Sequence, residues 1–272
     1  MRISVIIPAA GSSSRFNAGS DDPLAALGAP RSKLDEDLGG KTVLQRTIEL
    51  FNTRDDVHQI IVAGPHDNQN FAKFKAHHGD RFSLLGATLV RGGKDHRYES
   101  VQAALALVDE SATHIAIHDA ARPATKHELI DRIFHAAKNH LAVIPGVPLS
   151  DTLKRTKPDP IGDAGEVDQV AAILGAESKS PMYAVDQTLD RANLFAIQTP
   201  QVFEREILLR AYAQDDLSST DDAGLIERLG EQVVIVQGDP TNIKLTYANE
   251  LPLLRAIMGV KKTAPRPTHK RF

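Results

Sequence analysis

Hydrophobic side chains recur along the chain with two different periods, and stretches of the two kinds alternate. Residues 3–7 are rich in β-branched side chains, which is typical of a strand covered on both faces, and the run stops at Pro8-Ala9-Ala10-Gly11. Residues 43–51 carry hydrophobic side chains at helical spacing, and a second strand-like run follows at 60–63. This part of the chain is therefore predicted to fold as strand, loop, helix and strand.

The same alternation continues to the end of the chain. We expect further strands at 115–117, 142–144 and 233–236, and helices at 101–108, 128–137, 204–212, 221–229 and 250–258. Parallel neighbours in a sheet need crossover helices between them. The order therefore predicts an α/β fold, a three-layer Rossmann-like domain with a mostly parallel, twisted sheet.

Two stretches break the alternation. Between Pro148 and Pro200 the chain is polar and interrupted by prolines and glycines, which predicts an arm with an insertion at about 148–199 that leaves an otherwise single domain of residues 1–260. Residues 261–272 are basic and contain two prolines, which predicts a solvated, disordered tail.

Composition narrows the class of protein. The chain has 272 residues, of which 42% are hydrophobic and 25% charged, so it can bury a core and is too apolar to be disordered. A net charge of -3 gives no general attraction to nucleic acid or to an anionic membrane. The absence of cysteine excludes disulfides and a cysteine nucleophile, and it fits a reducing compartment. The opening apolar run is too short for a signal peptide or a membrane span, so we expect a cytoplasmic protein.

Small residues follow the first predicted strand, at positions 8–14, and Arg15 comes directly after them. Backbone N–H groups in such a loop can approach a phosphate or a base closely, and Arg15 could add a positive charge. A strand-to-helix turn capped by serines explains the loop equally well. Neither familiar phosphate-loop fingerprint is present, so a nucleotide would have to be bound by a different loop arrangement.

A second group, His118-Asp119-Ala120-Ala121-Arg122-Pro123, follows the predicted strand 115–117. Open α/β sheets place ligands at this carboxyl edge, where Asp119 could hold a divalent metal or a hydroxyl, or could cap the next helix. For His118 we favour a packed or capping role. Lys33 and Lys244 each lie in polar loops, and taken alone each indicates little more than a surface lysine.

Each of these segments is a weak signal alone, but their combination and order point to one protein family. Up to about residue 258, the chain resembles the 2-C-methyl-D-erythritol 4-phosphate cytidylyltransferase family. The resemblance rests on these segments in order: Pro8-Ala9-Ala10-Gly11 with Arg15, Lys33, Gly39-Gly40-Lys41-Thr42-Val43-Leu44, Gly92-Gly93 with Arg97 and Ser100-Val101, His118 to Pro123, Asp151-Thr152-Leu153-Lys154, Asp190-Arg191, Thr199-Pro200-Gln201, Thr220-Asp221 and Asn242-Ile243-Lys244.

The resemblance implies a nucleotidyltransferase in which the phosphate of methylerythritol phosphate attacks the α-phosphorus of CTP and expels pyrophosphate. Such a reaction needs positioning and positive charge rather than a protein nucleophile. By the resemblance, Arg15 and Lys33 stabilise the triphosphate, and Lys244 and Arg191 position the attacking phosphate. The residues that it implies for CTP are Ala9, Ala10, Gly11, Gly93 and Ser100, and those for the polyol phosphate are Asp119, Arg122, Thr152, Thr199 and Thr220.

The resemblance also implies a homodimer with shared active sites, in which the arm carries Thr152, Arg191 and Thr199 to the other subunit. The charge of the triphosphate implies Mg²⁺, held mostly by the CTP phosphates with Asp119 as a possible ligand.

The chain departs from the family pattern at several positions. Ser13 stands where the family usually has glycine, and Ser32 where it usually has proline. The stretch 20–31 is longer than usual, Lys94 or Asp95 is one extra residue, and an insertion at about 157–183 separates Lys154 from Asp190-Arg191. We prefer Asp190 over Asp186 as the family's aspartate because its distance to Thr199 fits.

Two other functions remain open at this point. The ribitol 5-phosphate cytidylyltransferases share the fold and the nucleotide end but act on another polyol phosphate, and His118 to Pro123 with Asp151-Thr152 favours the isoprenoid branch. A non-catalytic nucleotide-binding paralogue would explain Ser13 and the lengthened loops. Retention of Arg15, Lys33, Asp119 and Lys244 argues against it.

Overall fold

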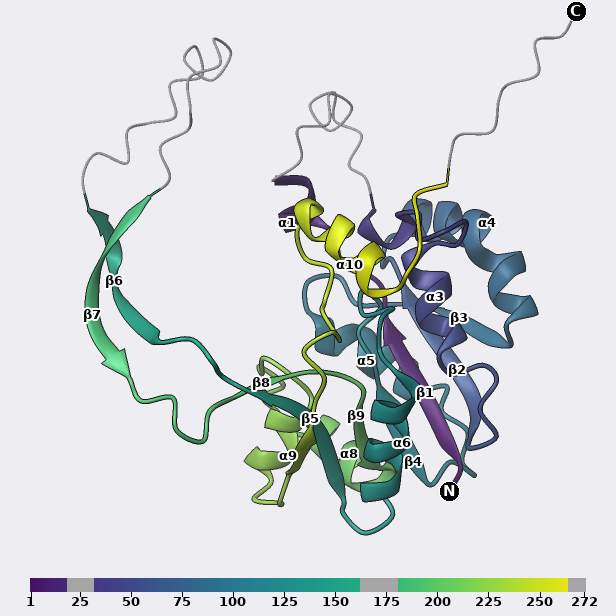
Figure 1. Cartoon of the computed structure of the whole chain (residues 1–272). Coiled ribbons are helices and arrows are strands. Elements are labelled where there is room, and N and C mark those ends of the chain that lie inside the picture. Colours follow the sequence, from purple (N-terminus) through teal and green to yellow (C-terminus); the bar gives the residue numbers. More distant parts are fainter. Residues whose placement is uncertain (19–31, 162–180, 264–272) are drawn as a thin grey trace, which may run out of the picture. The chain divides into compact units, whose positions relative to one another are not determined.

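The computed structural model describes residues 1–18, 32–161 and 181–263, which form two compact units (Figure 1). The first unit is Met1–Val147 together with the chain from Ile197, and the second is Pro148–Ala196. The long stretch 20–31, residues 162–180 of the insertion and the tail beyond Thr263 lie outside the described residues.

A twisted sheet forms the centre of the first unit, with strand order β10-β5-β9-β4-β1-β2-β3. Of these seven strands, β9 alone runs antiparallel to its neighbours. The strands are β1 (Ile3–Pro8), β2 (Val57–Gly64), β3 (Ala87–Arg91), β4 (His114–Ile117), β5 (Ala142–Pro148), β9 (Gln201–Glu204) and β10 (Val234–Gln237). The predicted α/β fold with a mostly parallel sheet is confirmed.

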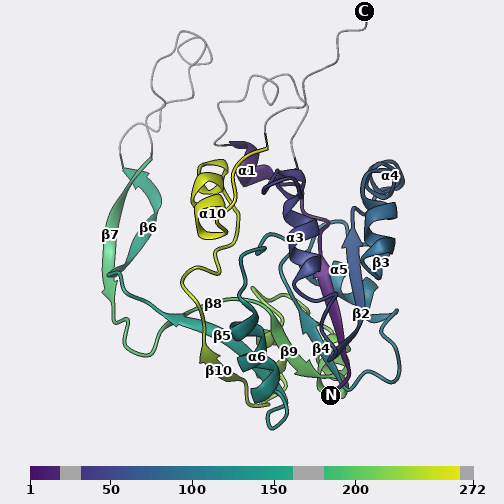
Figure 2. The ribbon, with the colours of Figure 1, turned by 45° about the vertical axis from the view of Figure 1, so that its right-hand side comes forward.

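Helices cover both faces of this sheet (Figure 2). One core packs α3 (Val43–Glu49), α6 (His127–Ala136) and α10 (Leu251–Ile257) against the sheet, and the other packs α5 (Arg97–Leu105), α8 (Arg205–Tyr212) and α9 (Ala223–Arg228). The remaining helical elements are α1 (Ser14–Ala18), η1 (Lys33–Asp35), α4 (Asn68–Leu84) and η2 (Ala248–Glu250).

The central strand β1 shows why its sequence is almost continuously apolar. Val5 and Ile7 face the first core, whereas Ile6 between them faces the second. Since successive side chains point to opposite faces, a strand covered on both sides needs apolar residues at consecutive positions.

The second unit is an antiparallel ribbon of β6 (Leu153–Ile161) and β7 (Met182–Leu189), in which Leu153 pairs with Leu189. The short strand β8 (Phe195–Ile197), where the chain passes back to the first unit, pairs with β5 of the main sheet. Several large apolar side chains of the ribbon are exposed, including Met182 at 66% and Val185 at 57%. A two-stranded ribbon has no core of its own, and such ribbons are marginally stable in isolation.

None of the helices that the structure describes combines the length and the apolar character needed to cross a bilayer.

Candidate active site

A cavity of about 380 Å³ opens at the carboxyl edge of the parallel strands. Its wall combines the loops that follow β1, β3 and β4 with η1 and with Lys244. Nine of the predicted site residues line it: Ala9, Ala10, Gly11, Arg15, Lys33, Gly93, Ser100, Asp119 and Lys244. Segments far apart in the sequence therefore meet where an open α/β sheet ordinarily binds its ligand.

The loop after β1 turns sharply at Ser13, whose φ is 57°. The Ser13 carbonyl accepts the first backbone bond of α1 from Asn17, and its hydroxyl accepts a bond from the Lys33 amide at 3.2 Å. Just before this turn, Gly11 lines the cavity, and a Cβ added there would meet no atom within 4 Å. A side chain at Gly11 would therefore project into space that a ligand could use.

The loop after β3 is packed tightly onto the first turn of α5. A Cβ added at Gly93 would lie 2.0 Å from the Cβ of Glu99, so this position requires glycine. The Gly93 amide donates to Ser100 Oγ at 2.9 Å, and the Glu99 carboxylate accepts bonds from the amides of Asp95 and His96. These bonds hold the loop against the cavity.

Asp119 lies among three cationic side chains. Its Oδ2 is 3.0 Å from Lys244 Nζ and 3.2 Å from Arg122 Nε, and its Oδ1 is 3.5 Å from Arg97 Nε. Burial alone would raise the pKa of Asp119, but Lys244, Arg97 and Arg122 outweigh it and hold the pKa well below its usual range. The carboxylate is therefore charged at any working pH.

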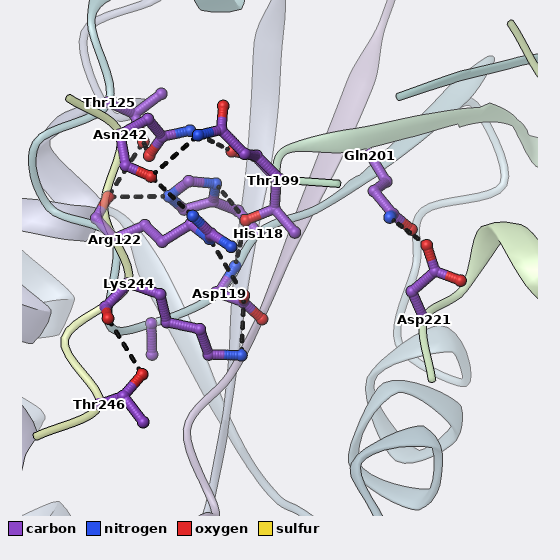
Figure 3. A network of polar contacts seen from close by, with 12 residues as sticks. His118, Asp119, Arg122, Thr125, Thr199, Gln201, Asp221, Asn242, Lys244 and Thr246 are labelled. Carbon is purple, nitrogen blue, oxygen red and sulfur yellow. Dashed lines mark hydrogen bonds and ion pairs between the residues drawn. The ribbon is translucent and has the colours of Figure 1, made fainter. Parts of the chain in front are cut away.

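Buried polar groups that include Thr199 and His118 hold the backbone next to the Asp119 side chain (Figure 3). The Asp119 amide donates to Thr199 Oγ1 at 3.0 Å. His118 is fully buried, with one ring nitrogen 3.2 Å from Thr199 Oγ1 and the other 3.2 Å from the Arg122 carbonyl, and its ring packs against that of Phe51 in a T-shaped arrangement. Burial lowers the pKa of His118 to about 4, so the imidazole is neutral near pH 7. His118 has the packed role that the sequence predicts.

Asn242 links this support to the segment of Lys244. Its amide nitrogen donates to the Thr199 carbonyl at 3.0 Å, and its amide oxygen accepts from Thr125 Oγ1 at 2.8 Å. The Asn242 carbonyl accepts from Arg122 Nη1 at 2.6 Å. Asn242 is completely buried, so this network explains why an asparagine two residues before Lys244 forms part of the recognised motif.

Lys33 reaches the same segment from η1. Its Nζ donates to the Leu245 carbonyl at 2.8 Å. Burial, together with the charge of Lys244, lowers the pKa of Lys33 to about 8. Because the positive charges of Lys33 and Lys244 repel each other, an anion that binds near both of them is strongly attracted.

The other predicted substrate residues are divided between the two units. Thr220 lines a second cavity of about 210 Å³, which shares His96 and Arg97 with the first. Thr152 and Arg191 belong to the second unit, where Arg191 donates to the Ser150 carbonyl. The prediction that Thr199 lies on the arm is wrong: it belongs to the first unit and is only 5% exposed, because its hydroxyl is used to hold Asp119.

Sequence reasoning gave no role to Arg97, although Arg97 was part of the motif at Gly92-Gly93. The structure places it in contact with Asp119 and with the buried Asp222, whose carboxylate is 2.6 Å from Arg97 Nη1. Lys94, Asp95 and His96 also line the cavity. The available signal was an arginine at the first position of a helix that begins at the ligand edge of the sheet.

Two groups of described residues could contact a divalent metal. In the cavity, the lining carboxylates are Asp95 and Asp119, and both oxygens of Asp119 already face cations, so a metal there needs ligands supplied by the bound molecule. Outside the cavity lining, Asp35 Oδ1 lies 2.8 Å from His78 Nε2 and 3.9 Å from His77 Nε2. The first distance is that of an ordinary hydrogen bond between η1 and α4.

Comparisons with known proteins show the family to which the chain is similar. The family model of 2-C-methyl-D-erythritol 4-phosphate cytidylyltransferase (IspD) matches residues 3–175 and 171–260. A protein of that name from Frankia casuarinae is 35% identical over 260 residues, which cover 95% of this chain and 82% of that protein. Another from Rhodococcus jostii is 35% identical and covers 93% of both chains. The crystal structure of the Thermus thermophilus protein of that name matches with a TM-score of 0.66 at 27% identity, covering 96% of this chain and 100% of the other.

Proposed function

The chain belongs to the 2-C-methyl-D-erythritol 4-phosphate cytidylyltransferase family, and from this premise we propose how its residues carry the reaction. It transfers the cytidylyl group of CTP to 2-C-methyl-D-erythritol 4-phosphate, giving 4-diphosphocytidyl-2-C-methyl-D-erythritol and pyrophosphate in isoprenoid precursor synthesis. One observation carries the assignment of roles: Arg15, Lys33 and Lys244 line a single cavity with the small residues of the β1 loop.

In the chemical step, an oxygen of the methylerythritol phosphate forms a bond to the α-phosphorus of CTP, and the bond to the bridging oxygen of pyrophosphate breaks. No protein nucleophile is needed, because the attacking oxygen already carries charge. Arg15 and Lys33 stabilise the negative charge of the triphosphate and of the leaving pyrophosphate. Lys244 attracts the attacking phosphate and orients it towards the α-phosphorus.

The nucleotide end of the cavity is assigned to Ala9, Ala10, Gly11, Gly93 and Ser100, all of which line it. Small side chains there leave room for backbone groups to contact the cytosine and the ribose. The tight packing of Gly93 on Glu99 keeps this wall rigid, which favours a pyrimidine over a larger purine.

The polyol end is assigned to Asp119, Arg122 and Thr220. Asp119 Oδ2 lies 3.2 Å from Arg122 Nε next to Lys244, and Thr220 lines the adjoining cavity. Thr199 contributes indirectly, because its hydroxyl accepts the bond that fixes the Asp119 amide.

We assign Mg²⁺ as the accompanying metal. The cavity offers more cationic than acidic side chains, which fits an ion that arrives on the triphosphate and takes at most one ligand, Asp119, from the protein. When bound, the ion would neutralise part of the charge on the phosphates.

We further propose that the active unit is a homodimer in the cytoplasm. Thr152 and Arg191 lie in the second unit, and the large apolar side chains exposed on its strands, such as Met182 and Val185, suit burial against a second copy of the chain. The absence of cysteine supports a reducing compartment.

Pyrophosphate release tests the function directly. The purified protein is assayed with CTP, Mg²⁺ and either 2-C-methyl-D-erythritol 4-phosphate or ribitol 5-phosphate, and we expect release with the first polyol phosphate at least about 100-fold faster, since buried polar groups reject a mismatched polyol. Faster release with ribitol 5-phosphate would contradict the assigned substrate.

A further inference from the structure

Arg97 is the first residue of α5 and lines both cavities. Its guanidinium contacts two carboxylates at once: Nη1 is 2.6 Å from Asp222 Oδ2, and Nε is 3.5 Å from Asp119 Oδ1. The second oxygen of Asp222 accepts a hydrogen bond from the Tyr212 hydroxyl at 2.6 Å. A continuous chain of contacts therefore runs from Tyr212 through Asp222 and Arg97 to Asp119.

Tyr212, Asp222 and Arg97 lie at the ends of three separate helices. Tyr212 ends α8, Asp222 is the residue before α9, and Arg97 begins α5. The Asp222 side chain is only 1% exposed, and a carboxylate buried so completely is costly unless cations and donors surround it. Burial and the neighbouring Asp222 also raise the pKa of Tyr212, so its hydroxyl keeps the proton that it donates.

The two oxygens of Asp119 face in different directions. Oδ2 contacts Lys244 and Arg122, whereas Oδ1 contacts Arg97. Without Arg97, the carboxylate could turn and offer both oxygens to Lys244 and Arg122. Lys244 would then be held more strongly by Asp119 and would be less available to an incoming phosphate.

We propose that Tyr212, Asp222 and Arg97 form a positioning chain that fixes the rotation of the Asp119 carboxylate and so keeps Lys244 available to the attacking phosphate. This inference rests on the proposed function, because it assigns Lys244 to that phosphate. Arg97 is a positioning residue here, and its guanidinium is required as a planar group that contacts two carboxylates, a geometry that a lysine ammonium cannot reproduce.

The test uses Arg97→Ala with chemical rescue. We expect kcat to fall about tenfold or more while the KM for CTP changes less than about threefold, because the residues assigned to the base are untouched. Millimolar guanidinium is then expected to restore part of kcat, whereas urea, which is uncharged and of similar shape, is not. Unchanged kcat in Arg97→Ala, or equal restoration by urea, would overturn the positioning role.

Two further variants keep the test decisive if Arg97→Ala does not fold. Arg97→Lys keeps the charge but loses the second contact, and Tyr212→Phe removes one hydroxyl, so both are expected to lower kcat at unchanged KM for CTP.

The matched control is Arg210→Ala on α8, which removes an exposed ion pair with Glu231 at 3.4 Å and is expected to leave kcat unchanged. Wild-type kcat in both Arg97→Lys and Tyr212→Phe would contradict the inference. Turnover by the wild-type protein reports the proposed function, and the ratio of variant to wild type reports the positioning chain, so the two failures are distinguishable.

Discussion

The backbone amide of Lys33 donates a hydrogen bond to the hydroxyl of Ser13 at 3.2 Å, joining the loop after β1 to the element that carries a cavity lysine. Ser13 occupies a left-handed conformation, with φ of 57°, that glycine adopts without strain and that costs other residues about 1 kcal/mol or more. The serine is therefore strained, and its hydroxyl offsets that strain by holding η1.

Replacement of Ser13 separates the two effects. Ser13→Ala keeps the strain and loses the hydrogen bond, so we expect it to lower the free energy of unfolding by about 1 kcal/mol. Ser13→Gly loses the same bond but removes the strain, so it is expected to be the more stable variant. Urea unfolding of both variants measures the difference. An alanine variant as stable as the glycine variant would show that the hydroxyl, rather than the backbone conformation, dominates at this position.

Removal of either cavity lysine is expected to slow turnover. Lys33→Ala and Lys244→Ala should each lower kcat about 100-fold or more, because a preorganised charge at a transferring phosphate contributes a few kcal/mol to the transition state. Steady-state pyrophosphate release measures this, and circular dichroism checks the fold. Lys138→Ala, at an exposed lysine after α6, is the matched control and should behave as wild type. Near-normal turnover in either cavity variant would remove that lysine from the proposed mechanism.

The lowered pKa of Lys33 predicts how activity depends on pH. Burial and the charge of Lys244 bring this pKa to about 8 in the free protein, so Lys33 is charged below that pH and loses its proton above it. Since kcat/KM reports the free protein, its value for CTP should fall as pH rises through about 8. Lys33→Arg stays charged at every accessible pH and should lack this step, whatever its absolute activity. A step of equal size in Lys33→Arg would assign the titration to another group.

His118 predicts a loss of stability in mild acid. Its pKa is about 4 in the fold, because of burial, against 6.5 for an unburied histidine, so between these values the unfolded chain binds the additional proton. Stability contributed by this group is therefore complete above about pH 6.5 and is lost as the pH falls towards 4. Between pH 7.5 and pH 5 the loss should be about 2 kcal/mol. Urea unfolding of wild type and His118→Gln at both pH values isolates the effect, and an identical pH dependence in the two proteins would contradict it.

The periodic segments of the sequence predicted the fold well because their side chains pack on a core. Helix α4 was missed although it spans 17 residues, since His78 and Phe82 are its buried residues and it presents no broad apolar stripe. Strand β9 was missed because it has four residues and lies directly after the irregular stretch that ends at Pro200. A short strand that pairs with strands far away in the sequence has no local pattern that identifies its partners.

The candidate site was predicted unevenly for a similar reason. Residues in loops after predicted strands, such as Gly11 and Asp119, were placed correctly at the carboxyl edge. Thr199 was assigned to the arm because sequence distance cannot show that the chain has already returned to the sheet, where Thr199 holds the Asp119 amide. The contact between Arg97 and Asp222, 125 residues apart, likewise depends on tertiary packing alone.

The last prediction concerns the second unit, where Arg191 lies between exposed strands and the return to the sheet. If the active unit is a dimer in which each site takes Arg191 from the other subunit, an Arg191→Ala subunit and a Lys33→Ala subunit complement each other. One site of the mixed dimer then combines an intact Lys33 with an intact Arg191. Equal mixing with full subunit exchange should yield about a quarter of wild-type activity, since half of the dimers are mixed and each has one working site.

A mixture of Lys33→Ala and Lys244→Ala subunits is the matched control: both lysines lie in the same cavity of one subunit, so no site is repaired and activity should stay at the level of the parents. Recovery in the control equal to that in the test mixture would refute the shared site, as would the absence of recovery in the test mixture after exchange is verified by mass spectrometry.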